Sequence, residues 1–75
     1  MMAVDVELFG QLADGELRRQ NLTLESPIPI SEVAILLGVN PDEVGLVTID
    51  GVQSSMQDKV PLTCRLCFFP PMSGG

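Results

Sequence analysis

The sequence predicts an α+β fold in which a mixed sheet of four or five strands packs against one crossing helix. Residues 4–8 and 21–25 each alternate strictly between apolar and polar side chains, as half-buried strands do. Residues 66–69 form a nearly continuous apolar run, which is typical of a strand at the centre of a sheet. One helical pattern lies between these segments, so the expected order is strand, strand, helix, strand, short strand, strand.

The two N-terminal strands are expected to pair as an antiparallel hairpin with a long loop. The buried face of the first strand would consist of Val4, Val6 and Leu8. Its two acidic residues, Asp5 and Glu7, would then face water. The connecting loop is rich in turn-forming residues, with Gly10 and an Asp-Gly pair at 14–15.

Helical signals begin only after the prolines at 27 and 29, which interrupt regular structure. Ser31 is a candidate N-cap, and Glu32 would lie in the first turn near the positive end of the helix dipole. Gly38 is a candidate C-terminal stop. The face expected to be buried consists of Val33, Leu36 and Leu37.

Residues 40–43, Asn-Pro-Asp-Glu, indicate a second helix start, with a capping Asn, Pro at the first helical position and Glu three residues after the cap. Residues 46–49 are apolar and largely β-branched, and the Asp-Gly pair at 50–51 favours a two-residue hairpin turn into a return strand at 52–53. If the last strand pairs in parallel with the first, the handedness of crossover connections leaves few alternative topologies.

A chain of 75 residues supports one hydrophobic core, so we expect a single domain at residues 1–71 and a flexible Gly-Gly tail at 72–75. Ten acidic and four basic residues would be repelled by nucleic acid and by anionic membranes, so we expect neither as a partner. The longest apolar stretch, residues 33–37, is far shorter than the ~18 residues of a membrane span. The N-terminus also lacks the basic region of a signal peptide, so the cytoplasm is the expected location.

The usual catalytic constellations are missing from the sequence. It contains no histidine and no Gly-rich phosphate loop, and its acidic residues are scattered along the chain. Cys64 and Cys67 have Cys-x-x-Cys spacing, but they enter a strand, where residues three apart point to opposite faces, and two further zinc ligands are lacking. We therefore expect a protein that is not itself an enzyme, binds no metal, and keeps both cysteines as reduced packing residues.

The C-terminal pair of Gly74 and Gly75 is the most informative feature. Without Cβ atoms the tail can enter a tunnel too narrow for other residues, and the carbonyl carbon of Gly75 is open to nucleophiles. Pro70 and Pro71 would end the last strand and hold the tail away from the sheet as a stiff spacer. The alternative is a frayed terminus or a cloning remnant, although a remnant would not normally continue an apolar strand.

The ending Phe-Pro-Pro-Met-Ser-Gly-Gly, residues 69–75, resembles the C-terminus of the molybdopterin synthase small subunit and its sulfur-carrier relatives, which share the ubiquitin-like β-grasp fold. Residues 6–10 look like the first strand of that family, and residues 40–51 look like its turn and hairpin. Two departures bear on the pathway and partner: Thr-Cys-Arg at 63–65 replaces a common Asp-Gly-Asp turn, and the loop at 11–17 has few basic residues.

The resemblance implies a role for Gly75. An ATP-dependent, E1-like adenylyltransferase would bind the sheet face and join the carboxylate of Gly75 to AMP, with ATP and magnesium belonging to that enzyme and no cofactor bound by the carrier. A persulfide from a sulfurtransferase would then displace AMP and leave a thiocarboxylate. The Phe-Pro-Pro ending favours sulfur donation in molybdenum or tungsten cofactor synthesis, together with the large subunit of molybdopterin synthase, over thiamine synthesis.

The family pattern makes Gly74 and Gly75 the reacting end and adds five contact residues for partners: Phe9, Phe69, Pro70, Pro71 and Met72. The two rings have a second interpretation as core packing, although Phe69 should face away from Leu66 and Phe68. Two other functions stay open. A ubiquitin-like modifier would pass the same adenylate to a lysine amine as an isopeptide bond, and a non-covalent β-grasp binding module would not need the glycines.

Overall fold

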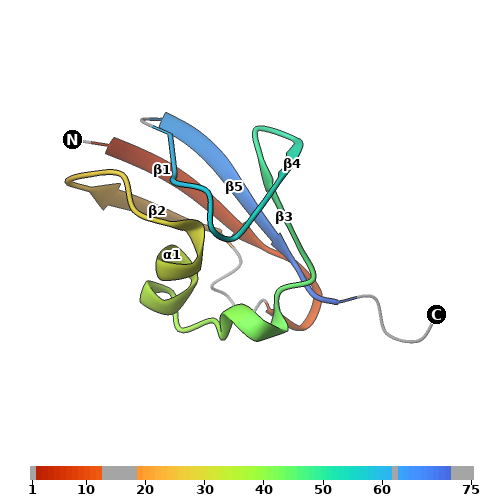
Figure 1. The fold of residues 1–75 in the computed structure, drawn as a ribbon. Coiled ribbons are helices and arrows are strands. Elements are labelled where there is room, and N and C mark those ends of the chain that lie inside the picture. The colour runs from red at the N-terminus through yellow and green to blue at the C-terminus, as the bar shows by residue number, and fades with distance from the viewer. Residues whose placement is uncertain (1, 13–18, 62, 72–75) are drawn as a thin grey trace.

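The computed structural model describes residues 2–12, 19–61 and 63–71, which form one mixed sheet with a helix across one of its faces (Figure 1). The strands are β1 (Met2–Leu8), β2 (Arg19–Leu24), β3 (Leu46–Ile49), β4 (Val52–Ser54) and β5 (Thr63–Phe69). Helix α1 (Ile30–Leu36) is accompanied by two short 3-10 turns, η1 (Gly10–Leu12) and η2 (Pro41–Glu43). The predicted order of strands and helix is confirmed.

The strand order β2-β1-β5-β3-β4 places the apolar C-terminal strand at the centre of the sheet, as predicted. Strand β1 pairs antiparallel with β2 and parallel with β5, and β5 pairs antiparallel with β3. The Asp-Gly pair at 50–51 turns the chain from β3 into β4 with φ of 51° and 86°, the positive values that such a turn requires. The Asp-Gly pair at 14–15 lies outside the described residues.

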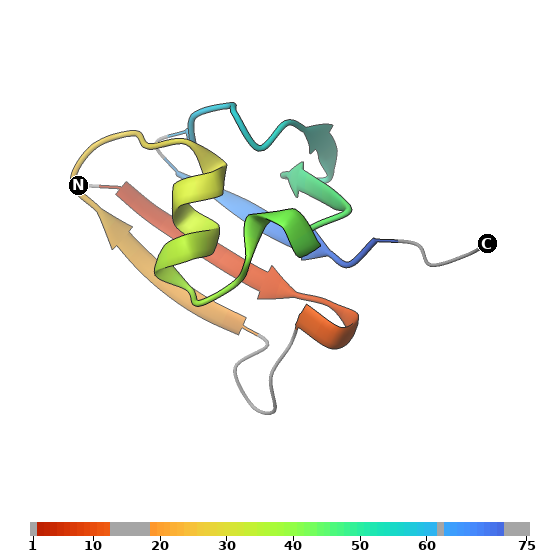
Figure 2. The same ribbon diagram turned by 60° about the horizontal axis from the view of Figure 1, so that its bottom comes forward.

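The core lies between the sheet and α1 (Figure 2). Alternate residues of β1 and β5 supply its sheet side: Val4, Val6, Leu8, Cys64, Leu66 and Phe68. Leu66 and Phe68 are 0% exposed, and burying a side chain of this size stabilises the fold by about 1.5–3 kcal/mol. Because successive strand residues point to opposite faces, Cys67 and Phe69 lie on the helix-free face, as predicted.

Helix α1 begins earlier than predicted, and Ser31 is not its N-cap. Pro29 takes that position, and no side chain caps the helix. The amides of the first turn donate instead to the segment before β5, Ile30 to the carbonyl of Asp58 and Ser31 to that of Met56, at 2.9 Å each. Backbone contacts between distant segments thus satisfy donors that a capping hydroxyl would otherwise bond.

The earlier start also changes the buried face of α1. The residues that pack on the core are Ile30, Val33, Ala34 and Leu37, which follow the i, i+3, i+4, i+7 spacing of one helical face. The prediction that Leu36 is buried is wrong, because this side chain is 64% exposed. Leu36 and Ile35 lie on the solvent side of the helix.

The predicted helix stop and second helix start are both confirmed. Gly38 has φ 79°, and the amide of Val39 donates to the carbonyl of Ala34 at 2.8 Å, the bond that closes a Schellman motif. The side chain of Asn40 then accepts the amide of Asp42 at 2.9 Å and caps η2.

Candidate functional site

The candidate site lies at the end of the sheet where the chain leaves β5. Figures 1 and 2 show the chain leaving the end of this central strand. Phe69 is the last residue of β5, and Pro70 and Pro71 follow it. Residues outside the described part of the chain include the predicted reacting and contact residues Gly74, Gly75 and Met72. The described residues therefore form the base from which the C-terminal segment departs.

Two glycines allow the two prolines to pack closely at this base. The amide of Gly45 donates to the carbonyl of Phe69 at 2.8 Å, which brings the backbone before β3 against the backbone after β5. A Cβ at position 45 would lie 2.4 Å from the Cα of Pro71, so no side chain fits there. At Gly10, where φ is 57°, a Cβ would lie 2.8 Å from the Cγ of Pro70. We call Gly10, Gly45, Pro70 and Pro71 the proline seat.

An aromatic pair lies next to the proline seat. The rings of Phe9 and Phe69 stack with centroids 4.6 Å apart and planes within 10° of each other. The amide of Phe9 donates to the carbonyl of Phe68 at 3.0 Å, so the chain after β1 stays beside β5. Both rings are half-buried and neither belongs to the buried core, so the pair presents an apolar surface on the helix-free face.

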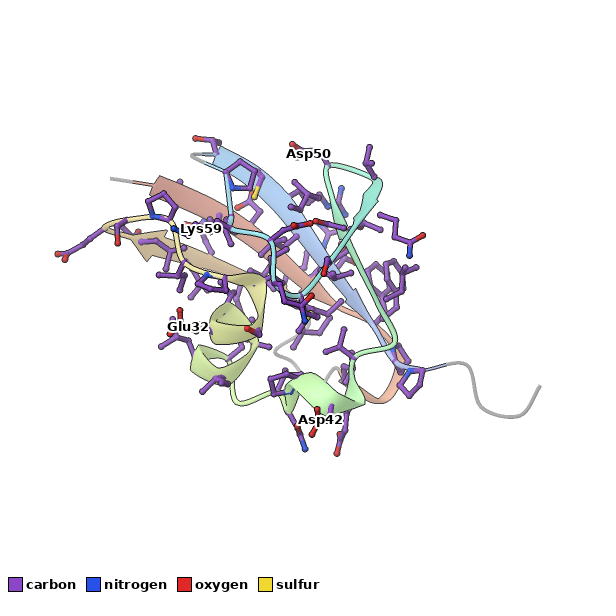
Figure 3. All side chains as sticks on the ribbon, viewed as in Figure 1. Glu32, Asp42, Asp50 and Lys59 are labelled. Carbon is purple, nitrogen blue, oxygen red and sulfur yellow. The ribbon has the colours of Figure 1, made fainter. Side chains whose placement is uncertain are left out.

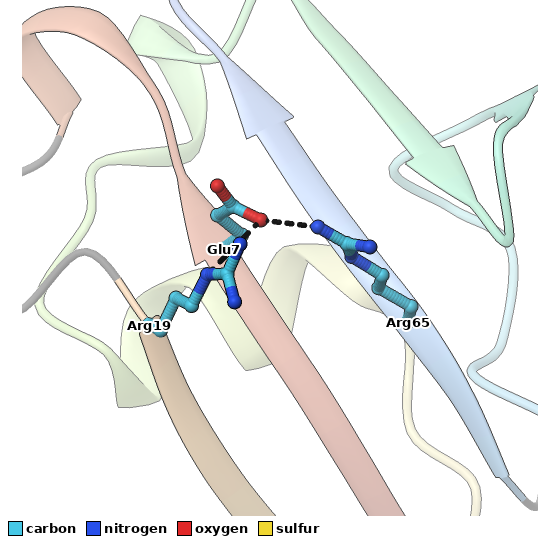
Figure 4. Close-up of polar contacts among 3 residues, drawn as sticks. All are labelled: Glu7, Arg19 and Arg65. Atoms are coloured by element: carbon cyan, nitrogen blue, oxygen red, sulfur yellow. Dashed lines mark hydrogen bonds and ion pairs between the residues drawn. The ribbon is translucent and has the colours of Figure 1, made fainter.

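The same face carries a carboxylate between two guanidinium groups (Figure 4). The Oε1 atom of Glu7 lies 2.5 Å from Nη2 of Arg65 and 3.5 Å from Nε of Arg19. The prediction that Glu7 faces water is wrong: the residue is only 7% exposed, because these arginines from β5 and β2 cover it. The hydrogen bond to Glu7 raises the pKa of Arg65 further above its usual value. The arginine side chains remain 75% and 55% exposed, which leaves their outer edges open to a partner.

The elements that cover the other face of the sheet carry exposed acids. Glu32 on α1 and Asp42 on η2 are both exposed there (Figure 3). The helix-free face carries both signs of charge, because Asp5 is exposed opposite Arg65 and Glu7 lies between the two arginines.

The cysteines do not form a reactive pair. Cys64 is buried on the helix-facing side of β5, whereas Cys67 lies half-buried on the other face, so the prediction that they point apart is confirmed. Burial, together with the nearby carboxylates of Asp50 and Asp5, raises the pKa of the Cys64 thiol. Among the described residues, no group of three or more Cys, Asp or Glu side chains is placed to hold a metal ion. Nor does this part of the chain contain a helix long and apolar enough to cross a membrane.

Comparison with known proteins bears on the fold. No protein-family model and no curated protein matches the sequence. Among solved structures, the crystal structure of SAMP1 from Haloferax volcanii matches with a TM-score of 0.71, over 97% of this chain and 99% of that chain, at 20% sequence identity. The fold is the ubiquitin-like β-grasp. The predicted fold class is thereby confirmed, and at this identity the likeness concerns the fold alone.

The β-grasp brings four predicted contact residues to one end of the sheet: Phe9, Phe69, Pro70 and Pro71. Sequence reasoning missed Gly45, Arg19 and Arg65 as parts of this region. A signal for Gly45 was present, since this glycine directly precedes a strand outside any predicted turn. For the arginines, only the strand register brings them to Glu7, through the pairs Glu7–Arg19 and Asp5–Arg65.

Proposed function

We propose that this chain is a sulfur carrier, whose C-terminal carboxylate on Gly75 is adenylated by an ATP-dependent activating enzyme and converted to a thiocarboxylate. The observation that carries the proposal is that the central strand of a β-grasp sheet continues directly into a seated Pro-Pro pair and a Gly-Gly terminus. Residues 72–75 can extend the carboxylate by at most about 13–14 Å beyond Pro71. This reach suits a domain that docks on an enzyme surface while its end enters the active site.

The activation step is needed because a free carboxylate resists nucleophiles. A carboxylate oxygen of Gly75 attacks the α-phosphorus of ATP, the bond to pyrophosphate breaks, and an acyl-adenylate forms. The terminal sulfur of a persulfide then attacks the acyl carbon, and AMP leaves with the electrons of the broken C–O bond. A second thiol cleaves the remaining S–S bond and releases the thiocarboxylate; hydrosulfide would give the same product directly.

In this reaction the chain is a co-substrate and not the catalyst. It contains no histidine, and the thiol of its buried Cys64 has a raised pKa, which disfavours the thiolate nucleophile. ATP, magnesium and the sulfur donor are supplied by the partners. The carrier contributes an unhindered acyl carbon at Gly75 and a surface that directs it.

We propose the helix-free face as the docking surface for the activating enzyme. The stacked rings of Phe9 and Phe69 lie there, and Leu46, which is 37% exposed, pairs with Phe69 across the sheet. The exposed guanidinium groups of Arg19 and Arg65 lie further along the same face. Asp5 is exposed beside Arg65, so this combination fits a partner with an apolar pocket bordered by polar groups of both charges.

For the sulfur acceptor, the Phe-Pro-Pro ending favours a pterin precursor in molybdenum or tungsten cofactor synthesis. The partner for that step would be the large subunit of the synthase, with the tail of this chain inserted into its active site. Thiamine synthesis is the alternative acceptor pathway.

Protein modification is a second candidate function, and the ubiquitin-like fold together with the Gly-Gly end supports it. The activation step would be identical, but a lysine amine of a target protein would displace AMP and form an isopeptide bond with Gly75. A non-covalent binding module, in contrast, would retain its function after deletion of Gly74 and Gly75.

The experiment that tests activation is ATP–pyrophosphate exchange with activating-enzyme fractions from the source organism. We expect exchange that depends on this chain and disappears when Gly74 and Gly75 are deleted. Exchange that survives the deletion would contradict the assignment of the terminal carboxylate. Hydrosulfide or a lysine-bearing protein can then be added to the active mixture to separate the carrier from the modifier.

A further inference from the structure

We infer that Gly45 is a positioning residue that, together with Gly10, sets the direction in which the chain leaves the sheet at Pro71 and so directs Gly75 into the activating enzyme. This role rests on the proposed function of the C-terminus. Gly45 lies in the segment before β3, within residues 40–51, where the resemblance concerns a turn and a hairpin and assigns no role to this glycine.

The contacts of Gly45 are with backbone atoms, which cannot move aside as a side chain can. A Cβ at this position would lie 2.4 Å from the Cα of Pro71, 2.8 Å from its nitrogen and 2.9 Å from the carbonyl oxygen of Pro70. Ordinary contact begins near 3.4 Å, so Pro71 would have to move by about 1.0 Å (3.4 minus 2.4) to admit a methyl group. The hydrogen bond from the amide of Gly45 to Phe69 fixes the same two segments at 2.8 Å.

The conformation of Gly45 gives no other reason for a glycine. Gly10, Gly38 and Gly51 all have positive φ, where a side chain is strained, but Gly45 does not. A methyl group at position 45 is therefore excluded by the approach of Pro71 and not by the backbone angles of residue 45 itself. The missing side chain is what allows the prolines to lie this close.

The direction matters because the seat sets the point and the direction from which residues 72–75 continue toward the reacting atom. The rings of Pro70 and Pro71 restrict φ to about −65°, so a shift of these two residues changes the direction in which the backbone continues. A displacement of the reacting atoms by about 1 Å can lower a rate on the order of 100-fold. Residues 72–75 lie between Pro71 and the reacting carboxylate, so we expect less than this full effect and a kcat for adenylation that is about 10-fold lower in Gly45→Ala.

Gly45→Ala should change kcat more than KM for the carrier, since it keeps the side chains of Phe9 and Phe69 and displaces the backbone at Pro71. The matched control is Gly38→Ala at the end of α1, where a Cβ meets nothing within 4 Å but the φ of 79° strains the new residue. This control should lose stability and keep kcat. A fall in kcat shared by both variants would mean that kcat follows stability, and it would overturn the inference.

An NMR measurement without the enzyme keeps the inference separate from the proposed function. In Gly45→Ala we expect faster hydrogen exchange of the amide at position 45 and shifted amide signals for Gly74 and Gly75, whereas Gly38→Ala should leave these signals in place. If the wild type supports no adenylation, the proposed function fails. The amide signals of Gly74 and Gly75 then still test whether Gly45 sets the direction of the chain after Pro71. Unshifted signals, or wild-type kcat in Gly45→Ala, would overturn the positioning role.

Pro71→Gly, which loosens the seat without a clash, should also lower kcat, and wild-type kcat in that variant would count against the role as well.

Discussion

Replacing Phe69 by alanine separates a docking role of this ring from a purely structural one. A structural role predicts only a loss of folding stability, whereas a docking role predicts a loss of binding affinity as well. The ring is half-buried and stacks on Phe9 at 4.6 Å. Truncating a fully buried Phe costs about 3–5 kcal/mol, so half of that, about 1.5–2.5 kcal/mol, is expected here. For a domain of this size the change corresponds to a fall in Tm of about 6–20 °C.

A docking role adds a separate cost that appears only on binding. An aromatic residue at the centre of an interface contributes about 2 kcal/mol, which corresponds to an increase in Kd of about 30-fold. Kd for the activating enzyme should be measured by titration calorimetry well below the Tm of the variant, so that the variant is folded. Leu36→Ala is the control, because it removes an exposed apolar side chain from the helix-bearing side and should leave Kd unchanged. The expected fall in Tm with an unchanged Kd for Phe69→Ala would refute the docking role.

Three further predictions concern the tail, acid stability and cysteine reactivity. Gly75→Ala should fold with an unchanged Tm yet lose ATP–pyrophosphate exchange, and wild-type exchange would contradict the tunnel argument. The hydroxyl of Ser54 and the amide of Ser55 donate to Asp58 and lower its pKa, so this carboxylate stabilises the fold above its ordinary pKa and loses that effect as pH falls through the lowered value. Asp58→Asn should therefore lower Tm near neutral pH and reduce the acid dependence of Tm; a Tm-versus-pH curve that matches the wild type would count against it. Because burial raises the pKa of Cys64, its alkylation by iodoacetamide at mildly alkaline pH should be slower in the native state than after unfolding, and equal rates would contradict the structure.

Features that depend on local chemistry could be predicted from the sequence. The strict alternation in β1 placed Val4 and Val6 in the core, and the apolar run in β5 indicated a central strand. The Asp-Gly pair at 50–51 and Gly38 were assigned correctly because a positive φ strongly favours such residues. In each case the physical cause lies within a few residues of its effect.

Features that depend on contacts between distant segments could not be predicted in this way. Ser31 had the chemistry of an N-cap, but amide donors of α1 bond the carbonyls of Met56 and Asp58, so the helix begins earlier and Leu36 turns outward. Glu7 alternated as a surface residue, yet arginines from two other strands cover it.

The candidate site shows the same division. The Gly-Gly end and the prolines could be recognised from the residue order at the C-terminus. The stacking of Phe9 on Phe69 was not anticipated. The seat needs the tertiary fold, because Gly45 meets Pro71 only when β3 pairs with β5. The role of Gly75 stays a prediction that rests on the chemistry of the tail.

The central claim is that Gly75 becomes a thiocarboxylate, and mass spectrometry of the C-terminal peptide tests it most directly. The protein is incubated with ATP, a sulfur donor and extract from its source organism, and the peptide is fragmented so that a sulfur-for-oxygen exchange is distinguished from oxidation of Met72. We expect the exchange to map to Gly75 and the product to react with a thiol alkylator. An unmodified Gly75 alongside isopeptide adducts, or a peptide without any change, would contradict the sulfur-carrier function.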